Sequence, residues 1–254
     1  ITDSAKIDVY APFIRNSDGL IVLIDPLQFQ AVKQAGMEGE RKEDPITVLQ
    51  TIHTKILKSG QDANEKNTMP MAVCISKIDI PVMTELLGAE VSGRLQQKLA
   101  PVRGANGFCK TVFNASQYNP IAKALNEYFM QNAYALAQAM MNSYTEYAWF
   151  AFSALGCDVE EKQTENGTVF ETPVGPVIPR HLEEPMLWLF YELGYISANE
   201  EIFSPLPQCP KCRSKSIDMF DTVTNTNGFG PFKKTWQYNC RCRECGNEWL
   251  SEDR

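Results

Sequence analysis

Two closely spaced pairs of cysteines are the residues whose spacing points most directly to chemistry. The pairs begin at Cys209 and Cys242, each has two residues between its cysteines, and 29 residues separate the two pairs. Each pair brings two thiolates to one side of a tight turn, and four thiolates complete a tetrahedral zinc site. Such a site is structural, because it leaves no open position for water. We therefore predict a zinc ribbon at residues 209–254 with these ligands: Cys209, Cys212, Cys242 and Cys245.

Four further cysteines lie outside these pairs. Cys240 could compete with Cys242, but only Cys242 and Cys245 have the two-residue spacing, so we expect Cys240 to lie outside the site. The others, Cys74, Cys109 and Cys157, are scattered among apolar neighbours. Isolated buried thiols together with one dense cluster are typical of a reducing compartment, so we expect a cytoplasmic protein.

Polar residues directly after two apolar runs form a second candidate site. The run Met71–Ile75 precedes Ser76, Lys77, Ile78 and Asp79, and the run at 149–152 precedes Ser153, Ala154 and Leu155. A short unbroken apolar run is typical of a parallel strand that is buried on both faces. Ligands of open α/β sheets bind just beyond the carboxyl ends of such strands, so both polar segments fall where a ligand would bind.

The remaining patterns predict the elements that position these residues. Residues 20–24 are a third apolar run, and helices are expected at 10–17, 44–60, 80–99, 119–144 and 185–194. These strands and helices predict an α/β domain over residues 1–195. The dipeptide Asn166-Gly167 predicts a β-hairpin at 158–173. Pro205 and Pro207 favour a linker at 196–208.

Three motifs occur in the order found in one family of nucleotide-binding proteins. They are Asp3, the Ser-Lys-Ile-Asp segment 76–79, and the Ser-Ala-Leu segment 153–155. The chain thereby resembles the second half of a Ras-like (TRAFAC-class) P-loop GTPase domain. The resemblance implies a Rossmann-like, mainly parallel sheet with helices on both faces, and GTP or GDP bound with magnesium. It further implies that Lys77 and Asp79 read guanine in the motif that Ser76 begins, that Ser153, Ala154 and Leu155 support the base, and that Asp3 holds magnesium through water.

Two departures from the family pattern leave alternatives open. Lys6 stands where the family has glycine after Asp3, so either this motif has decayed or residues are missing between Ala5 and Lys6. No GxxxxGK[ST] phosphate-binding loop occurs in these residues, so we expect one to precede Ile1 or to lie on a companion chain. With that loop the protein is a GTP-binding switch or GTP hydrolase. The alternative is an inactive GTPase-like scaffold whose zinc ribbon binds a protein or nucleic acid.

Charge and hydropathy limit the partners. The net charge of −7 argues against broad binding of nucleic acid. The ribbon is nevertheless locally basic, which admits nucleic acid or an acidic protein surface there. No apolar run approaches the roughly 20 residues that a membrane helix needs, so no membrane association is expected. The basic residues of the ribbon are Lys211, Arg213, Lys215, Lys233, Lys234, Arg241 and Arg243.

Overall fold

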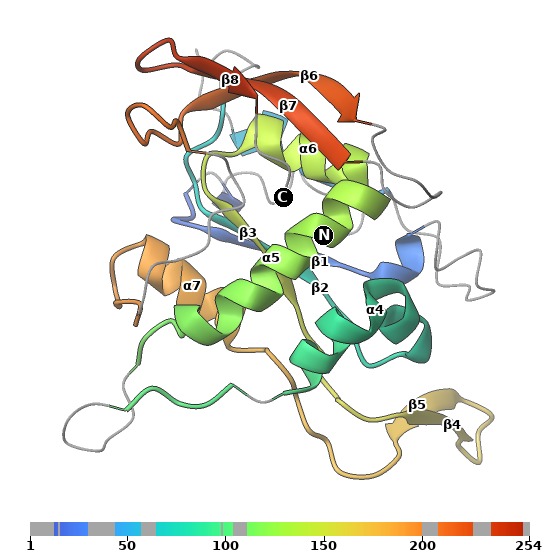
Figure 1. Ribbon diagram of the computed structural model, residues 1–254. Helices are drawn as coiled ribbons and strands as arrows, with labels where there is room; N and C mark the ends of the chain where they lie inside the picture. The colour runs from blue at the N-terminus through green and yellow to red at the C-terminus, as the bar shows by residue number, and fades with distance from the viewer. Residues whose placement is uncertain are drawn as a thin grey trace.

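A three-stranded parallel sheet lies at the centre of the molecule (Figure 1). The computed structural model describes residues 13–14, 16–29, 44–56, 65–97, 99–103, 111–199, 208–225 and 235–250. The strands of the sheet are β1 (Leu20–Ile24), β2 (Met71–Ile75) and β3 (Tyr147–Ala151), in the order β1-β2-β3. The parallel pairing of the three apolar runs is therefore confirmed, although β3 begins two residues before the predicted run.

β2 is the central strand because every one of its side chains can be buried. All five residues of β2 have 0% exposure, and each face of the strand packs into the core. β1 has the same apolar composition but a different environment, since Leu23 is 63% exposed and Ile24 is 2% exposed. An unbroken apolar run thus marks a strand buried on both faces at β2, whereas β1 buries its faces unequally.

Helices pack against the central sheet. The described helices are the 3-10 helix η1 (Pro26–Gln28) and the α-helices α3 (Pro45–Ile56), α4 (Pro81–Gln96), α5 (Ala115–Asn132), α6 (Tyr134–Ser143) and α7 (Glu184–Glu192). Phe129 of α5 stacks on Trp149, with ring centroids 4.0 Å apart, and Trp188 of α7 lies 5.7 Å from Phe150. Tyr118 of α5 also stacks on Phe150, with ring centroids 5.0 Å apart, so both α5 and α7 pack against β3.

Three helix ends follow the predicted capping signals. The Asp44 carboxylate accepts a hydrogen bond from the Ile46 N–H (2.8 Å) at the start of α3, where Pro45 occupies the first turn. Pro185 likewise lies in the first turn of α7, and Gly194 follows that helix with a φ of 76°. The Gly194 N–H donates to the Tyr191 carbonyl (2.9 Å), so the glycine closes the helix as expected.

The long helix predicted at 119–144 is wrong in two respects. Helix α5 begins at Ala115, so Pro120 lies inside it, and the helix stops at Asn132 before α6 begins. Tertiary contacts set the earlier start, because the Asn114 side chain donates to the Ala100 carbonyl (2.8 Å). The helix ends after Asn132, whose side chain donates to the Tyr128 carbonyl (3.0 Å) one turn earlier. The next residue, Ala133, has non-helical backbone angles.

Helix α4 is also less regular than its apolar pattern predicts. Gly88 has a φ of 78° and a ψ of 161°, which divides the helix into two parts. The Ser92 hydroxyl donates to the Thr84 carbonyl (3.0 Å) across this break. A residue with a β-carbon would be strained at this φ, so glycine permits the kink.

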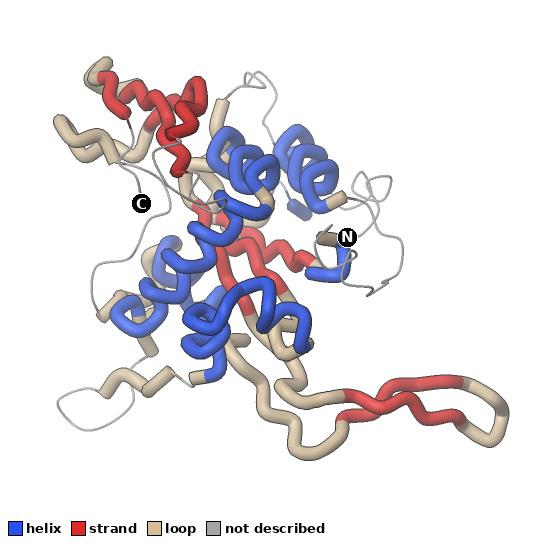
Figure 2. The backbone as a smooth tube through the Cα atoms, turned by 45° about the vertical axis from the view of Figure 1, so that its right-hand side comes forward, coloured by secondary structure: helices blue, strands red, loops and turns tan. Residues whose placement is uncertain are grey.

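Two small antiparallel sheets lie at opposite ends of the molecule (Figure 1). One is the predicted hairpin, formed by β4 (Val159–Gln163) and β5 (Val169–Pro173), which projects far from the helices (Figure 2). The other contains β6 (Ile217–Asn225), β7 (Thr235–Cys242) and β8 (Glu248–Leu250). We call this second sheet, together with the four cysteines of the two pairs, the cysteine ribbon.

The cysteine ribbon is attached to the amino ends of the central strands. The buried Lys66, which precedes β2, donates from Nζ to the Ile217 carbonyl at the start of β6 (2.8 Å). Glu146, which precedes β3, pairs with Lys215 at 3.2 Å. Burial, together with the nearby Arg243, lowers the pKa of Lys66 to about 8. No pattern near Lys66 predicts its burial, because that burial depends on the ribbon.

Lys66 makes the stability of the protein depend on pH in a defined direction. Between pH about 8 and 10.5 the folded protein has released the Lys66 proton while the unfolded chain retains it. The free energy of unfolding of the wild type is therefore expected to rise over this interval relative to that of Lys66→Met, which has no proton to release. Urea denaturation of both proteins from pH 7 to 10 measures the difference. A difference that stays constant across these pH values would contradict the prediction.

Candidate functional site

The four cysteines of the two pairs converge on one point in the cysteine ribbon. All four sulfur atoms lie within 4.8 Å of one another. The Cys209 and Cys245 sulfurs are 3.5 Å apart, as are those of Cys212 and Cys242. Tetrahedral zinc with Zn–S bonds of about 2.3 Å requires sulfurs about 3.8 Å apart, so small movements suffice to close the site on an ion. The cluster can therefore hold a metal ion such as zinc, with all four positions supplied by the chain.

Both cysteine pairs fold in the same way. In each pair, the residue after the second cysteine donates its N–H to the carbonyl of the first, from Arg213 to Cys209 (2.8 Å) and from Gly246 to Cys242 (2.9 Å). These two residues have positive φ angles of 60° and 69°. Glycine adopts such a φ without strain at 246, and the turn imposes it on Arg213. The repeated geometry explains why the four sulfurs face one another.

Hydrogen bonds to sulfur favour the thiolate form at the first cysteine of each pair, whereas the pKa of the second cysteine, Cys212 or Cys245, is raised. Although burial acts in the opposite direction, the N–H groups of Cys212 and Lys211 lower the pKa of Cys209 to about 7. Burial is likewise outweighed at Cys242, whose pKa is lowered by the N–H groups of Cys245 and Glu244. The first cysteine of each pair is thus prepared for coordination by its own turn.

Cys240 lies outside the cluster, in agreement with its spacing. Its sulfur is not among the four that converge, although the residue is fully buried. Cys240 pairs across the sheet with Trp249 of β8, and Trp249 packs against the core. Cys240 is therefore part of the packing of the ribbon.

Several basic side chains in the described part of the ribbon are paired with carboxylates. Arg243 Nε donates to Asp218 (2.7 Å), Arg241 pairs with Glu248 (2.7 Å), and Lys215 pairs with Glu146. Lys233 and Lys234 lie outside the described residues. Paired arginines offer less attraction to a phosphate backbone than the sequence alone indicates.

The second candidate site lies at the carboxyl ends of β2 and β3. The Phe152 N–H donates to the Ile75 carbonyl (2.9 Å), and the Ile78 N–H donates to the Phe152 carbonyl (3.4 Å). These bonds bring segment 76–79 next to the segment that begins at Ser153. The cysteine ribbon contacts residues that precede the same strands, so the two candidate sites lie at opposite ends of the sheet.

Charged side chains of this edge come from both β1 and β2. Lys77 has a φ of 57° and places Nζ 3.1 Å from the Asp25 carboxylate, which follows β1. Ser76 is bound to the same strand, because its N–H and its hydroxyl both donate to the Ile24 carbonyl (3.1 and 3.3 Å). Asp79 is half-buried, and no described residue donates a hydrogen bond to its carboxylate. The edge thus offers a fixed cation and an acceptor that is free among the described residues.

Segment 153–156 is held firmly against the chain that precedes α7. The buried Ser153 accepts the Gly156 N–H at its Oγ (2.8 Å) and exchanges two backbone hydrogen bonds with Arg180 (3.1 and 2.9 Å). Gly156 has a φ of 62°, and a β-carbon there would lie 1.8 Å from the Ile178 carbonyl oxygen. Only glycine fits this close approach. Ala154 and Leu155 remain exposed, with their backbone position fixed from both sides.

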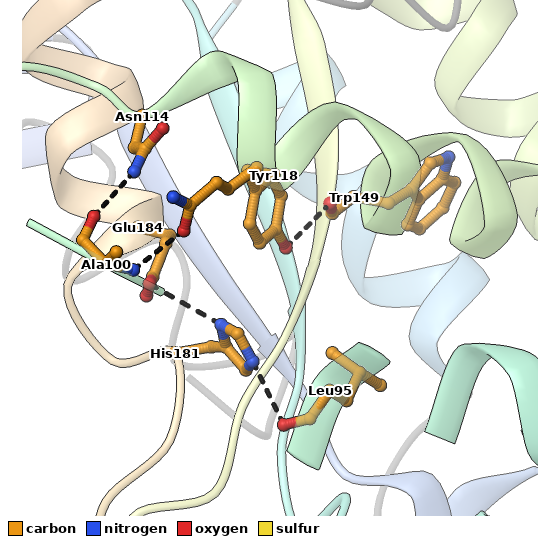
Figure 3. A network of polar contacts seen from close by, with 8 residues as sticks. Leu95, Ala100, Asn114, Tyr118, Trp149, His181 and Glu184 are labelled. Atoms are coloured by element: carbon orange, nitrogen blue, oxygen red, sulfur yellow. Dashed lines mark hydrogen bonds and ion pairs between the residues drawn. The ribbon is translucent and has the colours of Figure 1, made fainter. Parts of the chain in front are cut away.

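A buried histidine, for which sequence analysis predicts no partner, supports this arrangement. Figure 3 shows His181 between α4 and α7, with Nε2 donating to the Leu95 carbonyl (3.0 Å) and Nδ1 3.5 Å from the Glu184 carboxylate. Its φ is 54°, which turns the chain directly after Arg180. Nearby, the Tyr118 hydroxyl donates to the Trp149 carbonyl (3.4 Å). The only local signal was a glutamate three residues after the histidine.

One predicted site residue, Asp3, lies outside the described residues. None of the described helices combines the length and the apolar character needed to cross a membrane. The chain matches no model of a protein family, no curated protein and no solved structure.

Proposed function

We propose that this chain binds a guanine nucleotide at the edge where β2 and β3 end, as part of a Rossmann-like domain of the GTPase class. One observation carries the proposal. The half-buried Asp79 carboxylate accepts no hydrogen bond from a described residue, at the edge where ligands of parallel sheets bind. A carboxylate is acceptor-only and suits the N1–H and 2-amino group of guanine, which are two donors on one edge of the base.

The neighbouring residues fit supporting roles in this proposal. The Lys77 stem packs along the plane of the base while its ammonium is held by Asp25, 3.1 Å away. Ser153 fixes the turn that presents Ala154, whose N–H is used by no hydrogen bond between described residues. That N–H suits the carbonyl oxygen of guanine, which adenine lacks. Asp3 takes its proposed place beside magnesium.

The cysteine ribbon has a structural role in the same proposal. Four thiolates around zinc leave no position for a substrate, and the ribbon lies at the other end of the sheet. The alternative, an inactive scaffold that binds a partner through this ribbon, requires no nucleotide. Nucleotide content therefore separates the two functions.

The test is to identify the nucleotide that accompanies the full-length protein. Protein purified with magnesium is precipitated with acid, and the released small molecules are separated by chromatography and identified by mass. GDP or GTP is expected, with no adenine nucleotide. Protein that carries no nucleotide and does not bind fluorescently labelled GDP would support the scaffold instead.

A further inference from the structure

The hairpin formed by β4 and β5 is a strand pair whose outer edges meet no other described strand. It extends away from the helices and the central sheet, so nothing described lies against it (Figure 2). Every residue of β4 is exposed, and the apolar side chains of Val159, Val169 and Phe170 are 42%, 56% and 43% exposed. A two-stranded hairpin is marginally stable in water, and apolar side chains at its surface gain stability when they are covered.

The hydrogen-bond register identifies which backbone groups face outward. The Val174 N–H donates to Asp158 (2.8 Å), and the Thr164 N–H donates to Thr168 (2.9 Å). Asp158 and Thr164 flank β4, so the even-numbered positions of this segment direct their backbone hydrogen bonds toward β5. Hydrogen-bonded and non-bonded pairs alternate along an antiparallel ladder. The N–H and carbonyl groups of Val159, Glu161 and Gln163 therefore point to the outer edge of β4. On β5 the corresponding outer edge is interrupted by Pro173, which has no N–H.

The charge of the hairpin selects the chemistry of a partner. Glu161 lies directly opposite Glu171, in a non-bonded pair where side chains come closest. Two like charges in such a pair repel each other, and a cation beside them relieves the repulsion. On the same face Val159 and Val169 flank the two carboxylates. Residues 158–173 carry five carboxylates and one lysine, which disfavours nucleic acid and anionic membranes as partners.

We propose that the outer edge of β4 binds an extended, basic segment of a partner protein by strand addition. The partner strand places a lysine or arginine opposite Glu161, and β-branched residues two positions before and after it lie beside Val159 and Gln163, where they cover Val159 and extend over Gln163 toward Val169. The backbone groups of Val159, Glu161 and Gln163 supply the pairing. This site is independent of the proposed nucleotide-binding edge.

The test uses a library of random twelve-residue peptides selected on the full chain and then measured by fluorescence anisotropy at physiological salt. Enriched peptides are expected to carry a basic residue with β-branched residues two positions away on each side. Glu161→Lys is expected to weaken their binding at least about fivefold, because it replaces an attractive cross-strand pair by a repulsive one. Glu161→Lys also places opposite charges at the 161–171 pair, so the variant hairpin remains folded.

Glu165→Lys, which makes the same change of charge in the turn, is the matched control and should leave binding within about twofold. For a strand added antiparallel to β4, a proline two positions from the basic residue of the peptide should abolish binding, since it removes an N–H that pairs with Val159 or Gln163. No enrichment on the wild type would overturn the proposal, and the carboxylates would then only protect an exposed edge. Equal effects of Glu161→Lys and Glu165→Lys would overturn it as well.

Discussion

Cys212→Ser is expected to release the metal ion and to unfold the cysteine ribbon while the α/β part of the chain keeps its structure. The ribbon is small, and its described buried residues are few, so metal binding supplies most of its stability. Structural zinc contributes about 10–16 kcal/mol in comparable small sites, more than such a segment can replace by packing. Metal content measured by mass spectrometry should fall from one ion per chain to none. Hydrogen exchange should become fast in β6, β7 and β8 and stay slow in β2.

Cys240→Ser is the matched control for this experiment. Cys240 is buried in the same ribbon, but its sulfur lies outside the cluster of four. The variant should therefore retain one metal ion per chain and the protection of the ribbon from exchange. Retention of the metal by Cys212→Ser together with its loss from Cys240→Ser would show that the ligand set is wrong.

Asp79→Asn is expected to change which base the full-length protein prefers. The substitution replaces one acceptor oxygen by an amide donor, which should weaken GTP and improve binding of xanthosine triphosphate, whose 2-position bears a carbonyl. Hydrogen bonds to a charged group contribute about 1.5–3 kcal/mol each, so a change of at least about tenfold in the ratio of the two affinities is expected. Calorimetry with both nucleotides on wild type and variant measures this ratio.

Lys77→Ala distinguishes base reading from general damage to the edge. Its stem is proposed to contact the plane of the base, so its loss should weaken both nucleotides to a similar degree. The ion pair with Asp25 that it also removes is half-exposed at Lys77, so its loss should change stability little. An unchanged ratio of affinities in Asp79→Asn would mean that Asp79 only caps the end of β2.

The sequence predicted the structure best where a local residue pattern by itself determines the backbone conformation. The run 71–75 becomes a strand buried on both faces, and Asn166-Gly167 places the hairpin turn, where Gly167 has a φ of 80°. The cysteine spacing located the cluster and excluded Cys240, because two short turns of identical geometry need no information from the rest of the chain.

The sequence was least informative where distant residues decide the structure. The start of α5 depends on the contact between Asn114 and Ala100, so the favourable Asn-Pro signal five residues later was overridden. Lys66 and His181 are buried against partners far away in the sequence or on another element. Lys66 contacts the Ile217 carbonyl, and His181 contacts the Leu95 carbonyl and the Glu184 carboxylate. A polar side chain that hydrogen-bonds to a carbonyl far away in the sequence produces no hydrophobic pattern around its own position, so sequence analysis does not detect its burial.

The order of the strands has a consequence for how the chain is made. Leu20 pairs with Met71, and Met71 pairs with Tyr147, so each parallel pairing joins segments far apart in sequence. Such non-local pairing slows folding, because long loops must close before any contact compensates for the lost entropy. During synthesis the apolar segment 71–75 emerges well before its neighbour at 147–151. It must therefore be kept from aggregation until the ribosome has released β3, whereas the turns of the cysteine ribbon can form as soon as they emerge.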